Sequence, residues 1–500
     1  MHLSWGVSGP GRSRAHVEIE VGLFRMQSPV QPGSSAGQES IIVCRNSQGA
    51  SVRGSLMHFS NQTAVFEVYN PFSILQLSEV LMDFRIMIGE RSLYAGRAVV
   101  SSLMNTGIML LCEATLVDAW SDVDVLSIFG NKEAIRTELR RFVTEWRTRS
   151  NILPDFKVFT GDFQGFLTDL NLWMRQVEVT LGQAETLAGP AMVELVEKVV
   201  DPLRPVAAEF FQGLESLANR IDPDLAGMHK AFLRSSLHPL TLCAPFVHRS
   251  FTKPLGYAGD YEMINMILER PYEGRTLFAK VINKLVLEAS PAEAHRNRIV
   301  ILHRLLTQEN ARAARNQTRL DVLNIGCGPA KEVRDFIESS PDSGRCRMTL
   351  MDFSKEALEY ARDAALACKK ERRSEIELKF VEKSIDELLR ESISLAPANQ
   401  IVHKDYDFVY CAGLFDYLTD SVCRRLIALF YEWLRPGGLL CVTNIHPTNP
   451  QRHFMEFLLE WNVIHRTEAE FDKLGPPDVE KEVIADPTGV NIFLNLRKPG

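Results

Sequence analysis

Nothing in the sequence marks a metal site, a membrane span or a nucleic-acid-binding face. The nine cysteines form no CxxC pair and belong to no His/Cys cluster of the kind that binds zinc. No apolar run approaches the ~20 residues that cross a bilayer, and the first residues lack the apolar core of a secretory signal. No long Lys/Arg run occurs and the formal net charge is −7, whereas phosphate-binding surfaces are basic. We therefore expect a cytoplasmic protein with reduced thiols, no metal, no nucleic-acid partner and no membrane span.

The pattern of apolar and polar residues changes twice along the chain, which predicts several domains. Its 500 residues exceed what a single core usually organises. Short alternating runs such as AVFEVY and GIMLLCEATLV, separated by turn residues, predict a small antiparallel barrel or sandwich. Apolar residues at helical spacing follow, and strands then alternate with helices, which predicts a parallel sheet built from βαβ units. We expect an α/β fold with a mobile N-terminus (1–39), a β-barrel (40–126), a helical region (127–317) and a Rossmann-like domain (318–500).

The strongest motif is a glycine-rich turn near the start of the last part. A strand of the buried type, LDVLNI, runs into Gly326, Cys327 and Gly328 and then into a helix. A backbone that turns sharply from strand to helix and closely approaches a nucleotide needs glycine, because a Cβ obstructs both. Alone, this turn is weak evidence, since a purely structural turn shows the same pattern.

Further elements follow this turn in the order that a Rossmann-like sheet requires. The second strand, CRMTLMD, ends in Asp352, and an acidic residue at this place is positioned to bind both hydroxyls of a ribose. Ser354 is expected to cap the next helix. The third strand ends near Ser384, and the fourth, YDFVYC, opens into a polar and aromatic loop. A helix, a Pro-Gly-Gly turn and a fifth strand complete the pattern.

This succession resembles the class I S-adenosylmethionine-dependent methyltransferases over about residues 318–498. The resemblance implies that S-adenosylmethionine is the cofactor, that Gly326 and Gly328 line its methionine part and that Asp352 binds its ribose. It places Phe353 on the adenine, Ser384 and Ile385 at the adenine edge, and Cys411 and Ala412 under the sulfonium. Asn324, just before the glycines, is the remaining cofactor contact.

Two departures from the family pattern affect the glycine turn. The acidic residue common before the glycines is Asn324 here, and Ala330 replaces a third glycine. Asparagine still accepts a hydrogen bond from a cofactor amine or a water, so we expect weaker binding rather than none. An NAD site and a purely structural turn are the alternatives. The five elements in sequence, with the RPGGLL turn before the fifth strand, argue against both.

A segment upstream of this domain is expected to fold over the methyl-transfer site. Residues 248–261 (HRSFTKPLGYAGDY) combine glycines, a proline and rigid aromatic rings. Methyl transfer from a sulfonium is an in-line displacement, for which good positioning contributes ~7–11 kcal/mol. We expect residues 253–261 to form a lid, with Tyr257 in a catalytic role and Lys253 and Tyr261 binding the substrate. A packed structural loop is the alternative.

The same segment resembles bacterial methyltransferases grouped with the synthases of 3-hydroxy fatty acid methyl esters, which are quorum signals. This second resemblance implies a fatty-acid carboxylate as the methyl acceptor.

Two loops after the fourth and fifth strands are expected to face the same crevice. Asp416 and Tyr417 in the first loop are candidates for substrate binding. His446 in the second is a candidate catalytic base for an alcohol or amine acceptor, because imidazole titrates near neutrality. A carboxylate acceptor needs no base, and a structural role for His446 is the alternative.

The β-rich part near the N-terminus resembles PilZ domains, the bacterial receptors of cyclic-di-GMP. Ser60 matches the (D/N)xSxxG turn of these receptors, but His58 and Thr63 replace its first and last residues. Arg45 and Arg53 are too far apart for the usual RxxxR motif. We therefore expect a degenerate barrel used for homodimerisation or regulation, without cyclic-di-GMP binding; a nucleotide sensor is the alternative.

The sequence as a whole predicts a methyltransferase that acts on a small molecule. Methylation of a protein side chain, and a non-enzymatic protein that senses S-adenosylmethionine, are the alternatives.

Overall fold

The structure is a computed structural model that describes residues 40–60, 62–68, 75–88, 91–105, 110–118, 136, 140, 143, 152–182, 189–393 and 405–500. Residues 40–500 form one compact unit. The mobile N-terminus expected over residues 1–39, and most of a helix expected over residues 132–149, lie outside the described residues. None of the described helices combines the length and the apolar character that a membrane span needs.

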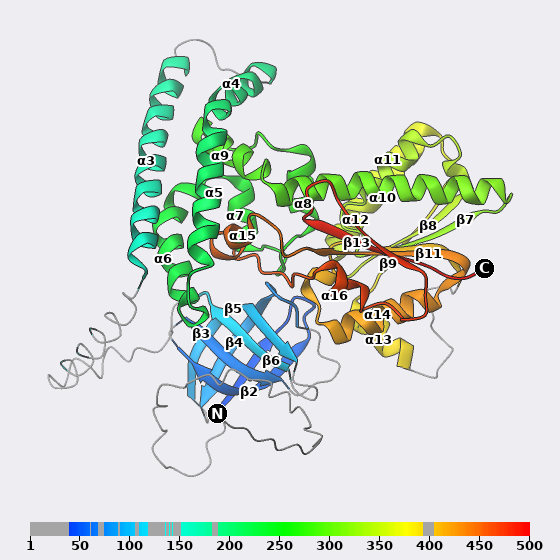
Figure 1. Ribbon diagram of the computed structural model, residues 1–500, viewed down its shortest axis with the longest axis horizontal. Helices are drawn as coiled ribbons and strands as arrows, with labels where there is room; N and C mark the ends of the chain where they lie inside the picture. The colour runs from blue at the N-terminus through cyan, green and yellow to red at the C-terminus, as the bar shows by residue number, and fades with distance from the viewer. Residues whose placement is uncertain are drawn as a thin grey trace, which may run out of the picture. The chain divides into compact units, whose positions relative to one another are not determined.

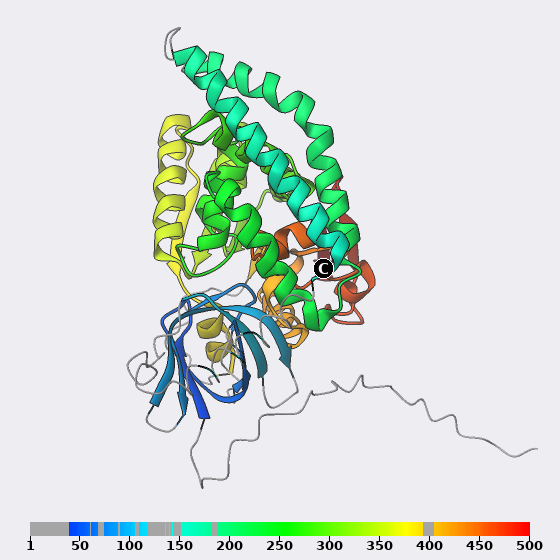
Figure 2. The same cartoon turned by 90° about the vertical axis from the view of Figure 1, so that its left-hand side faces the viewer.

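The first part of the described chain is a closed antiparallel barrel with strand order β1-β2-β3-β6-β5-β4, as expected (Figures 1 and 2). Alternate residues point inward, and in β3 these are Ala64, Phe66 and Val68. The ring of Phe84 packs against the rings of Phe66 and Tyr94 in the barrel core, where the six strands bury a common interior. The strands are β1 Ser40–Arg45, β2 Ser51–Phe59, β3 Thr63–Val68, β4 Val80–Ile88, β5 Arg91–Asn105 and β6 Leu110–Leu116.

Helices form the middle of the chain, and proline sets where several of them begin. Proline has no amide hydrogen, so it fits the first turn of a helix, where that hydrogen has no partner. As expected, Pro202, Pro205 and Pro223 divide this region into separate helices. The helices are α3 Pro154–Gly182, α4 Pro190–Val200, α5 Arg204–Ala218, α6 Pro223–Thr241, α7 Pro245–Thr252, α8 Tyr261–Glu269, α9 Leu277–Leu287 and α10 Ser290–Arg315, with a 3₁₀ turn at Asp201–Leu203.

The C-terminal part contains a seven-stranded sheet in the order β12-β13-β11-β10-β7-β8-β9. The strands β7, β8, β9, β10 and β11 run parallel to one another, and β13 pairs antiparallel with β11 and β12. The carboxyl ends of β7, β8 and β10 therefore meet at one edge of the sheet. The strands are β7 Leu320–Ile325, β8 Cys346–Asp352, β9 Glu377–Glu382, β10 Tyr406–Cys411, β11 Leu434–Ile445, β12 Lys481–Ala485 and β13 Asn491–Arg497.

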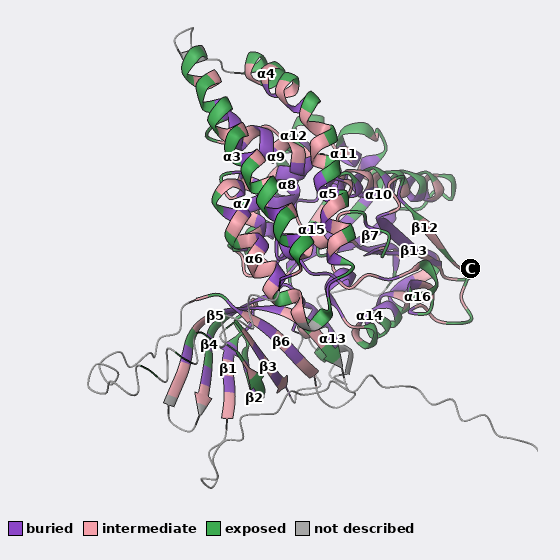
Figure 3. Cartoon of the chain, turned by 60° about the vertical axis from the view of Figure 1, so that its left-hand side comes forward, coloured by how far each residue is buried: buried purple, intermediate pink, exposed green. Residues whose placement is uncertain are grey.

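Helices cover both faces of this sheet (Figure 1). Successive strand residues alternate between two cores: Val322 packs in one with Phe336, and Leu323 packs in the other with Phe430. Burial is nearly continuous along the central strands β7, β8 and β10, whereas the edge strands β9 and β12 and much of the outer side of α3 and α4 are more exposed (Figure 3). The helices α10, α11 (Lys331–Ser339) and α12 (Lys355–Arg372) cover one face, and α13 (Ile385–Ile393), α14 (Asp420–Glu432) and α16 (Glu468–Asp472) cover the other.

Two features differ from the sequence expectation. The hairpin β12–β13 extends the sheet beyond the five expected strands. The segment HFMEFLLEWNVIHR (453–466) has one apolar face and predicts a helix, but the structure forms only the short α15, Arg452–Phe457. Glu460 adopts a left-handed conformation with φ 53°, and the Trp461 amide bonds back to the Met455 carbonyl at 2.8 Å. This reversal ends the helix and turns the Trp461 segment inward.

The barrel contacts two segments that belong to the rest of the chain. The Val80 amide donates to the Gly256 carbonyl at 2.6 Å, and the Asn462 amide donates to the Ser78 hydroxyl at 2.6 Å. Gly256 lies in the proposed lid segment, and Asn462 follows Trp461. The barrel therefore bonds directly to both segments.

Candidate functional site

The glycine turn after β7 borders an open space. Gly326 and Gly328 have positive φ values of 66° and 50°, which other residues adopt only with strain. A Cβ added to either glycine would meet no atom within 4 Å. The Cys327 amide bonds to the Met351 carbonyl at 3.0 Å, which ties the turn to β8. The turn thus presents bare backbone to a cavity at the carboxyl edge of the sheet.

This cavity has a volume of about 670 Å³, part of which is open to solvent. Its walls come from the glycine turn, from the ends of β10 and β11, from α8 and α10, and from the end of the segment that was expected to form a lid. It is lined by Gly259, Tyr261, Ile264, His295, Arg298, Ile299, Leu302, Asn324, Gly326, Cys327, Gly328, Pro329, Glu332, Tyr410, Ala412, Gly413, Asp416, Tyr417, Ile445 and Trp461.

Asp352 ends β8 beside the glycine turn, as the sequence predicts. Its two carboxylate oxygens accept hydrogen bonds from the amides of Gly328, at 3.0 Å, and Ser354, at 2.9 Å. Burial raises the pKa of Asp352, and these amide donors oppose that shift. The Ser354 hydroxyl accepts from the Ala357 amide at 3.3 Å, so the predicted helix cap is confirmed. The carboxylate is therefore held in one orientation next to the turn.

An aromatic pair lies next to Asp352. The ring of Tyr257, from the segment upstream of the domain, lies 5.0 Å from the ring of Phe353 at an interplanar angle of 58°. Burial raises the pKa of the Tyr257 hydroxyl, so it stays protonated. Neither residue belongs to the cavity walls. A catalytic role for Tyr257 stays a prediction.

Ser384 and Ile385 lie at the start of α13 and away from the cavity walls. The Ser384 hydroxyl donates to the Glu387 carboxylate at 3.0 Å and accepts from the Glu387 amide at 3.2 Å. Its geometry is that of a helix cap. Contacts of Ser384 and Ile385 with an adenine edge stay a prediction.

Asn324, at the position where the family pattern has an acid, donates to a carboxylate that the sequence did not indicate. Its amide nitrogen bonds to Glu332 Oε1 at 3.0 Å, and the Tyr410 hydroxyl donates to the same oxygen at 2.9 Å. Glu332 lies on α11, lines the cavity and is 4% exposed. Burial raises the pKa of Glu332, and the bond from Tyr410 lowers it. Glu332 thus gives the cavity an acidic group, although Asn324 replaces the acidic residue that the family pattern has before the glycines.

The end of β10 contributes a mixed polar and apolar wall. Ala412 lines the cavity, whereas Cys411 is fully buried in the core on one face of the sheet. Asp416 accepts from the Ile445 amide at 2.8 Å, and burial raises the pKa of Asp416 to about 6. The Tyr417 hydroxyl accepts from Trp461 Nε1 at 2.8 Å. Both Asp416 and Tyr417 line the cavity, and their binding of a substrate stays a prediction.

The expected lid segment contributes some of its predicted residues to the cavity. Gly259 and Tyr261 line the wall, and the Tyr261 hydroxyl donates to Glu356 at 2.8 Å. Burial and the neighbouring Glu356 raise the pKa of Tyr261 to about 12. Lys253 instead ends α7 in a left-handed conformation, with its amine buried outside the cavity walls. Burial lowers the pKa of Lys253 to about 8, and the amine has no hydrogen-bond partner among the described residues.

His446 lies beyond the end of β11 and outside the cavity walls. Its Nδ1 is bonded to the Thr448 hydroxyl at 2.7 Å. This contact is what a structural role predicts, and a catalytic role for His446 stays a prediction.

Two side chains of α10 that the sequence reasoning did not single out reach the cavity. His295 and Arg298 are 6% and 7% exposed and stand one helical turn apart on the buried face of the helix. His295 Nδ1 bonds to the Pro291 carbonyl at 2.7 Å, and burial lowers the pKa of His295 to about 3, so the ring is neutral. Ionisable residues on the otherwise apolar face of a helix were the available signal for both positions.

Comparisons with known proteins agree with the chemistry of this edge of the sheet. Residues 322–438 match the family model of the methyltransferase domain, which covers less than half of the chain. No curated protein sequence matches.

Solved structures resemble the chain only distantly. A possible exported protein from Bordetella parapertussis is 16% identical with TM-score 0.38 and covers 63% of this chain and 100% of its own. The N-methyltransferase NodS from Bradyrhizobium japonicum, solved with S-adenosyl-L-homocysteine, is 17% identical with TM-score 0.29. The match covers 43% of this chain and 90% of NodS. Magnesium protoporphyrin IX methyltransferase from Synechocystis, solved with the same ligand, is 13% identical with TM-score 0.32. The match covers 46% of this chain and 92% of that methyltransferase. These scores are too low to carry an argument, and it is the family match that shows a methyltransferase domain over residues 322–438.

Proposed function

We propose that this chain transfers the methyl group of S-adenosylmethionine to the carboxylate of a fatty acid, in particular a 3-hydroxy fatty acid, and releases the methyl ester. The observation that carries the proposal is the bare glycine turn beside Asp352, at the edge of the domain that matches the methyltransferase family. An apolar pocket in the helical region supports an acyl acceptor.

The residues at the sheet edge fit S-adenosylmethionine. The open space over Gly326 and Gly328 gives room for a ligand against the backbone, and the Asp352 carboxylate stands at the end of β8, where a ribose is expected. Asn324, Phe353, Ser384, Ile385, Cys411 and Ala412 are the further cofactor contacts that we propose.

The chemistry needs little from the protein beyond orientation and the exclusion of water. Bound S-adenosylmethionine supplies an electrophilic methyl group, and an ionised carboxylate oxygen attacks it in line, so that the carbon–oxygen bond forms as the carbon–sulfur bond breaks and no proton moves. Tyr417 and Trp461 form part of the cavity wall and limit the access of water. The Tyr417 hydroxyl accepts from Trp461, which leaves its own hydrogen available to orient an acceptor oxygen.

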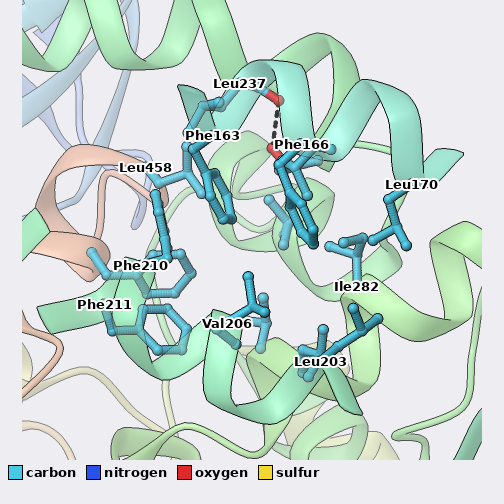
Figure 4. Close-up of a pocket in the computed structure, with 17 residues that line it drawn as sticks. Phe163, Phe166, Leu170, Leu203, Val206, Phe210, Phe211, Leu237, Ile282 and Leu458 are labelled. Carbon is cyan, nitrogen blue, oxygen red and sulfur yellow. Dashed lines mark hydrogen bonds between the residues drawn. The ribbon is translucent and has the colours of Figure 1, made fainter. Parts of the chain in front are cut away.

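A second pocket in the helical region suits the tail of such an acceptor. Residues of α3, α5, α6, α9 and the α15 segment line a pocket of about 590 Å³, part of which is open to solvent (Figure 4). Its walls are apolar except for Thr241, whose hydroxyl donates to the Leu237 carbonyl at 3.0 Å and is thus occupied (Figure 4). The walls consist of Phe163, Phe166, Leu167, Leu170, Leu203, Val206, Ala207, Phe210, Phe211, Leu237, Thr241, Val247, Ile282, Leu285, Val286, Phe454 and Leu458.

The two pockets share one segment of chain. Phe454 and Leu458 line the apolar pocket, and Trp461, three residues after Leu458, lines the cofactor cavity. All three belong to a single hydrophobic cluster. We propose that the acyl chain lies in the apolar pocket while its carboxylate reaches the cofactor cavity.

We further propose that the chain works as three domains, a regulatory barrel of the PilZ type (40–126), a helical substrate cap (127–317) and the catalytic domain (318–500). The bonds from the barrel to Gly256 and Asn462 support a regulatory role, because both segments adjoin the cavity. Homodimerisation through the barrel is part of this proposal.

Turnover with defined acids tests the proposed function. The purified full chain is incubated with S-adenosylmethionine and saturated or 3-hydroxy acids of increasing length, and both products are measured by mass spectrometry. We expect S-adenosylhomocysteine and a methyl ester in equal amounts, and no reaction when the acid is already esterified. Binding without turnover on any acceptor would indicate a sensor of S-adenosylmethionine. A methylated protein in place of an ester would indicate a protein methyltransferase, and either result overturns the ester proposal.

A further inference from the structure

Arg298 is a buried cation that is ion-paired with no other described residue, although the carboxylates of Asp416 and Glu332 oppose the lowering of its pKa by burial. It lies on α10, is 7% exposed and lines the cofactor cavity. Within the ranges that the structure describes, its guanidinium forms no hydrogen bond and no ion pair. Burying an unpaired charge is costly, so buried arginines are normally paired with an anion. The cavity is therefore built to receive an anionic group from a ligand.

The backbone at the end of β10 is shaped to admit this guanidinium. Gly413 has φ 87°, and a Cβ at this position would lie 2.9 Å from Arg298 Nη1. The Gly413 amide donates to the Thr443 hydroxyl at 2.9 Å, which fixes the peptide in this conformation. A side chain at position 413 would displace Arg298 from the cavity. The glycine and the arginine thus form one structural arrangement.

Glu332 supplies the opposite charge in the same cavity. Its carboxylate is oriented by Asn324 and Tyr410, which both donate to Oε1. Within the described residues no ion pair joins Glu332 to Arg298, although both line the cavity. A buried cation and a buried anion that are kept apart in this way complement a ligand carrying both charges on neighbouring atoms. An α-amino acid has this charge distribution.

We propose that Arg298 and Glu332 form a clamp for the amino-acid end of the cofactor, with Arg298 on its α-carboxylate and Glu332 on its α-ammonium. The inference rests on the proposed function, since it takes S-adenosylmethionine as the ligand. The clamp explains why Asn324 replaces the acidic residue of the family pattern. The negative charge comes instead from Glu332 on the following helix, and Asn324 orients the Glu332 carboxylate. The glycine turn, where the methionine part is expected, lines the same cavity.

An acceptor carboxylate is the other possible anion, and the charges of the cavity disfavour it. Such an acceptor is anionic only, and it would stand near Glu332 and Asp416, which both line the cavity. A carboxylate held in a charge-assisted bond to arginine would also be a weaker nucleophile. The methionine end of the cofactor has neither disadvantage, because its ammonium offsets Glu332.

Calorimetric titration of the full chain with three ligands tests the clamp. S-adenosylhomocysteine carries both charges, decarboxylated S-adenosylmethionine lacks the carboxylate, and 5′-methylthioadenosine lacks the whole amino-acid end. Arg298→Met should weaken S-adenosylhomocysteine by about 10–100-fold, as expected for the loss of a charge-assisted bond, and leave the other two ligands unchanged. Glu332→Gln should weaken the first two ligands and spare 5′-methylthioadenosine. Arg298→Lys should retain part of the affinity.

The matched control is Arg296→Met on the same helix, since Arg296 pairs with Glu293 and does not line the cavity. It should leave all three affinities unchanged. Equal losses for 5′-methylthioadenosine would show a merely structural role and overturn the clamp. Unchanged binding of S-adenosylhomocysteine with a raised KM for the acid would assign Arg298 to the acceptor, which overturns the clamp and keeps the proposed function. Failure of the wild-type chain to bind any of the three would overturn both.

Discussion

The indole nitrogen of Trp461 donates a 2.8 Å hydrogen bond to the hydroxyl of Tyr417, and Gly259 packs against both side chains. A Cβ at Gly259 would lie 2.9 Å from the Tyr417 hydroxyl and 3.2 Å from the Trp461 ring. The segment upstream of the catalytic domain is therefore in contact with the loop after β10. This contact is the structural basis for treating residues 253–261 as a lid.

Gly259→Ala should lower turnover as well as stability. The residue has φ 73°, and a non-glycine residue in the left-handed region costs about 1–2 kcal/mol. Gly489→Ala, outside the lid segment, is the matched control, because Gly489 has φ 72° but no atom within 4 Å of an added Cβ. Both variants should lose stability in thermal melts, and Gly259→Ala should lose more because its added Cβ also approaches the Tyr417 hydroxyl at 2.9 Å. Only Gly259→Ala should also lose turnover per folded molecule, and equal turnover in the two variants would refute the lid.

Ala207→Phe should block long acyl chains while leaving the cofactor site intact. Ala207 lines the apolar pocket, and each methylene buried there should contribute about 0.8 kcal/mol, or roughly fourfold in affinity. We expect the variant to raise KM for long-chain acids and to leave KM for short acids and the Kd of S-adenosylhomocysteine unchanged. Ala208→Phe, at the exposed neighbouring position, is the control. If KM depended on the length of the acid in the same way in both variants, the acyl chain would have to lie elsewhere.

Asp416→Asn should change how stability depends on pH. Burial raises the pKa of Asp416 to about 6, whereas an unfolded aspartate titrates near ~3.9. Between these values the folded chain binds more protons than the unfolded chain, so wild-type stability should fall as pH rises from 4 to 7. The total is about 3 kcal/mol at 1.36 kcal/mol per pKa unit. The variant should lack this fall, so its melting temperature relative to wild type should increase with pH; a constant difference would contradict the assignment.

The barrel should not bind cyclic-di-GMP at micromolar concentration. The Ser60 hydroxyl accepts from the Thr63 amide at 3.0 Å, so the turn that matches the receptor motif is closed by its own bonds. Arg45 is exposed and pairs with Asp83 at 3.4 Å. Titration of the full chain with cyclic-di-GMP, and with GMP as the control for guanine, measures this. Saturable binding specific for the dinucleotide would make the protein a second-messenger effector.

Sequence reasoning was most successful where local patterns determine structure. The barrel, the glycine turn, Asp352 at the end of β8 and the Ser354 cap all follow from short-range rules of alternation, turn chemistry and capping. The combination of Asp416 and Tyr417 in one cavity also follows, because parallel strands end at the same edge of a sheet.

The remaining features depend on contacts distant in sequence. Arg298 and Glu332 occupy ordinary helical positions, and only tertiary packing shows that both are buried around one cavity. The short α15 depends on the left-handed Glu460, a residue type that does not by itself predict a chain reversal. The close approach of Gly259 to Tyr417 is likewise a tertiary contact, so the loss of stability expected for a side chain at this position does not follow from local sequence.

Binding of S-adenosylhomocysteine to wild type and Asp352→Ala, measured by calorimetry, tests the central claim most directly. The claim is that the cavity beside the glycine turn is the cofactor site of a methyltransferase. We predict saturable binding to wild type and a loss of about 1.5–3 kcal/mol, roughly 10–150-fold, in the variant. Asp363→Ala, at an exposed position of α12, should bind like wild type. Absence of binding to wild type, or equal binding to Asp352→Ala with an unchanged melting temperature, would contradict the account.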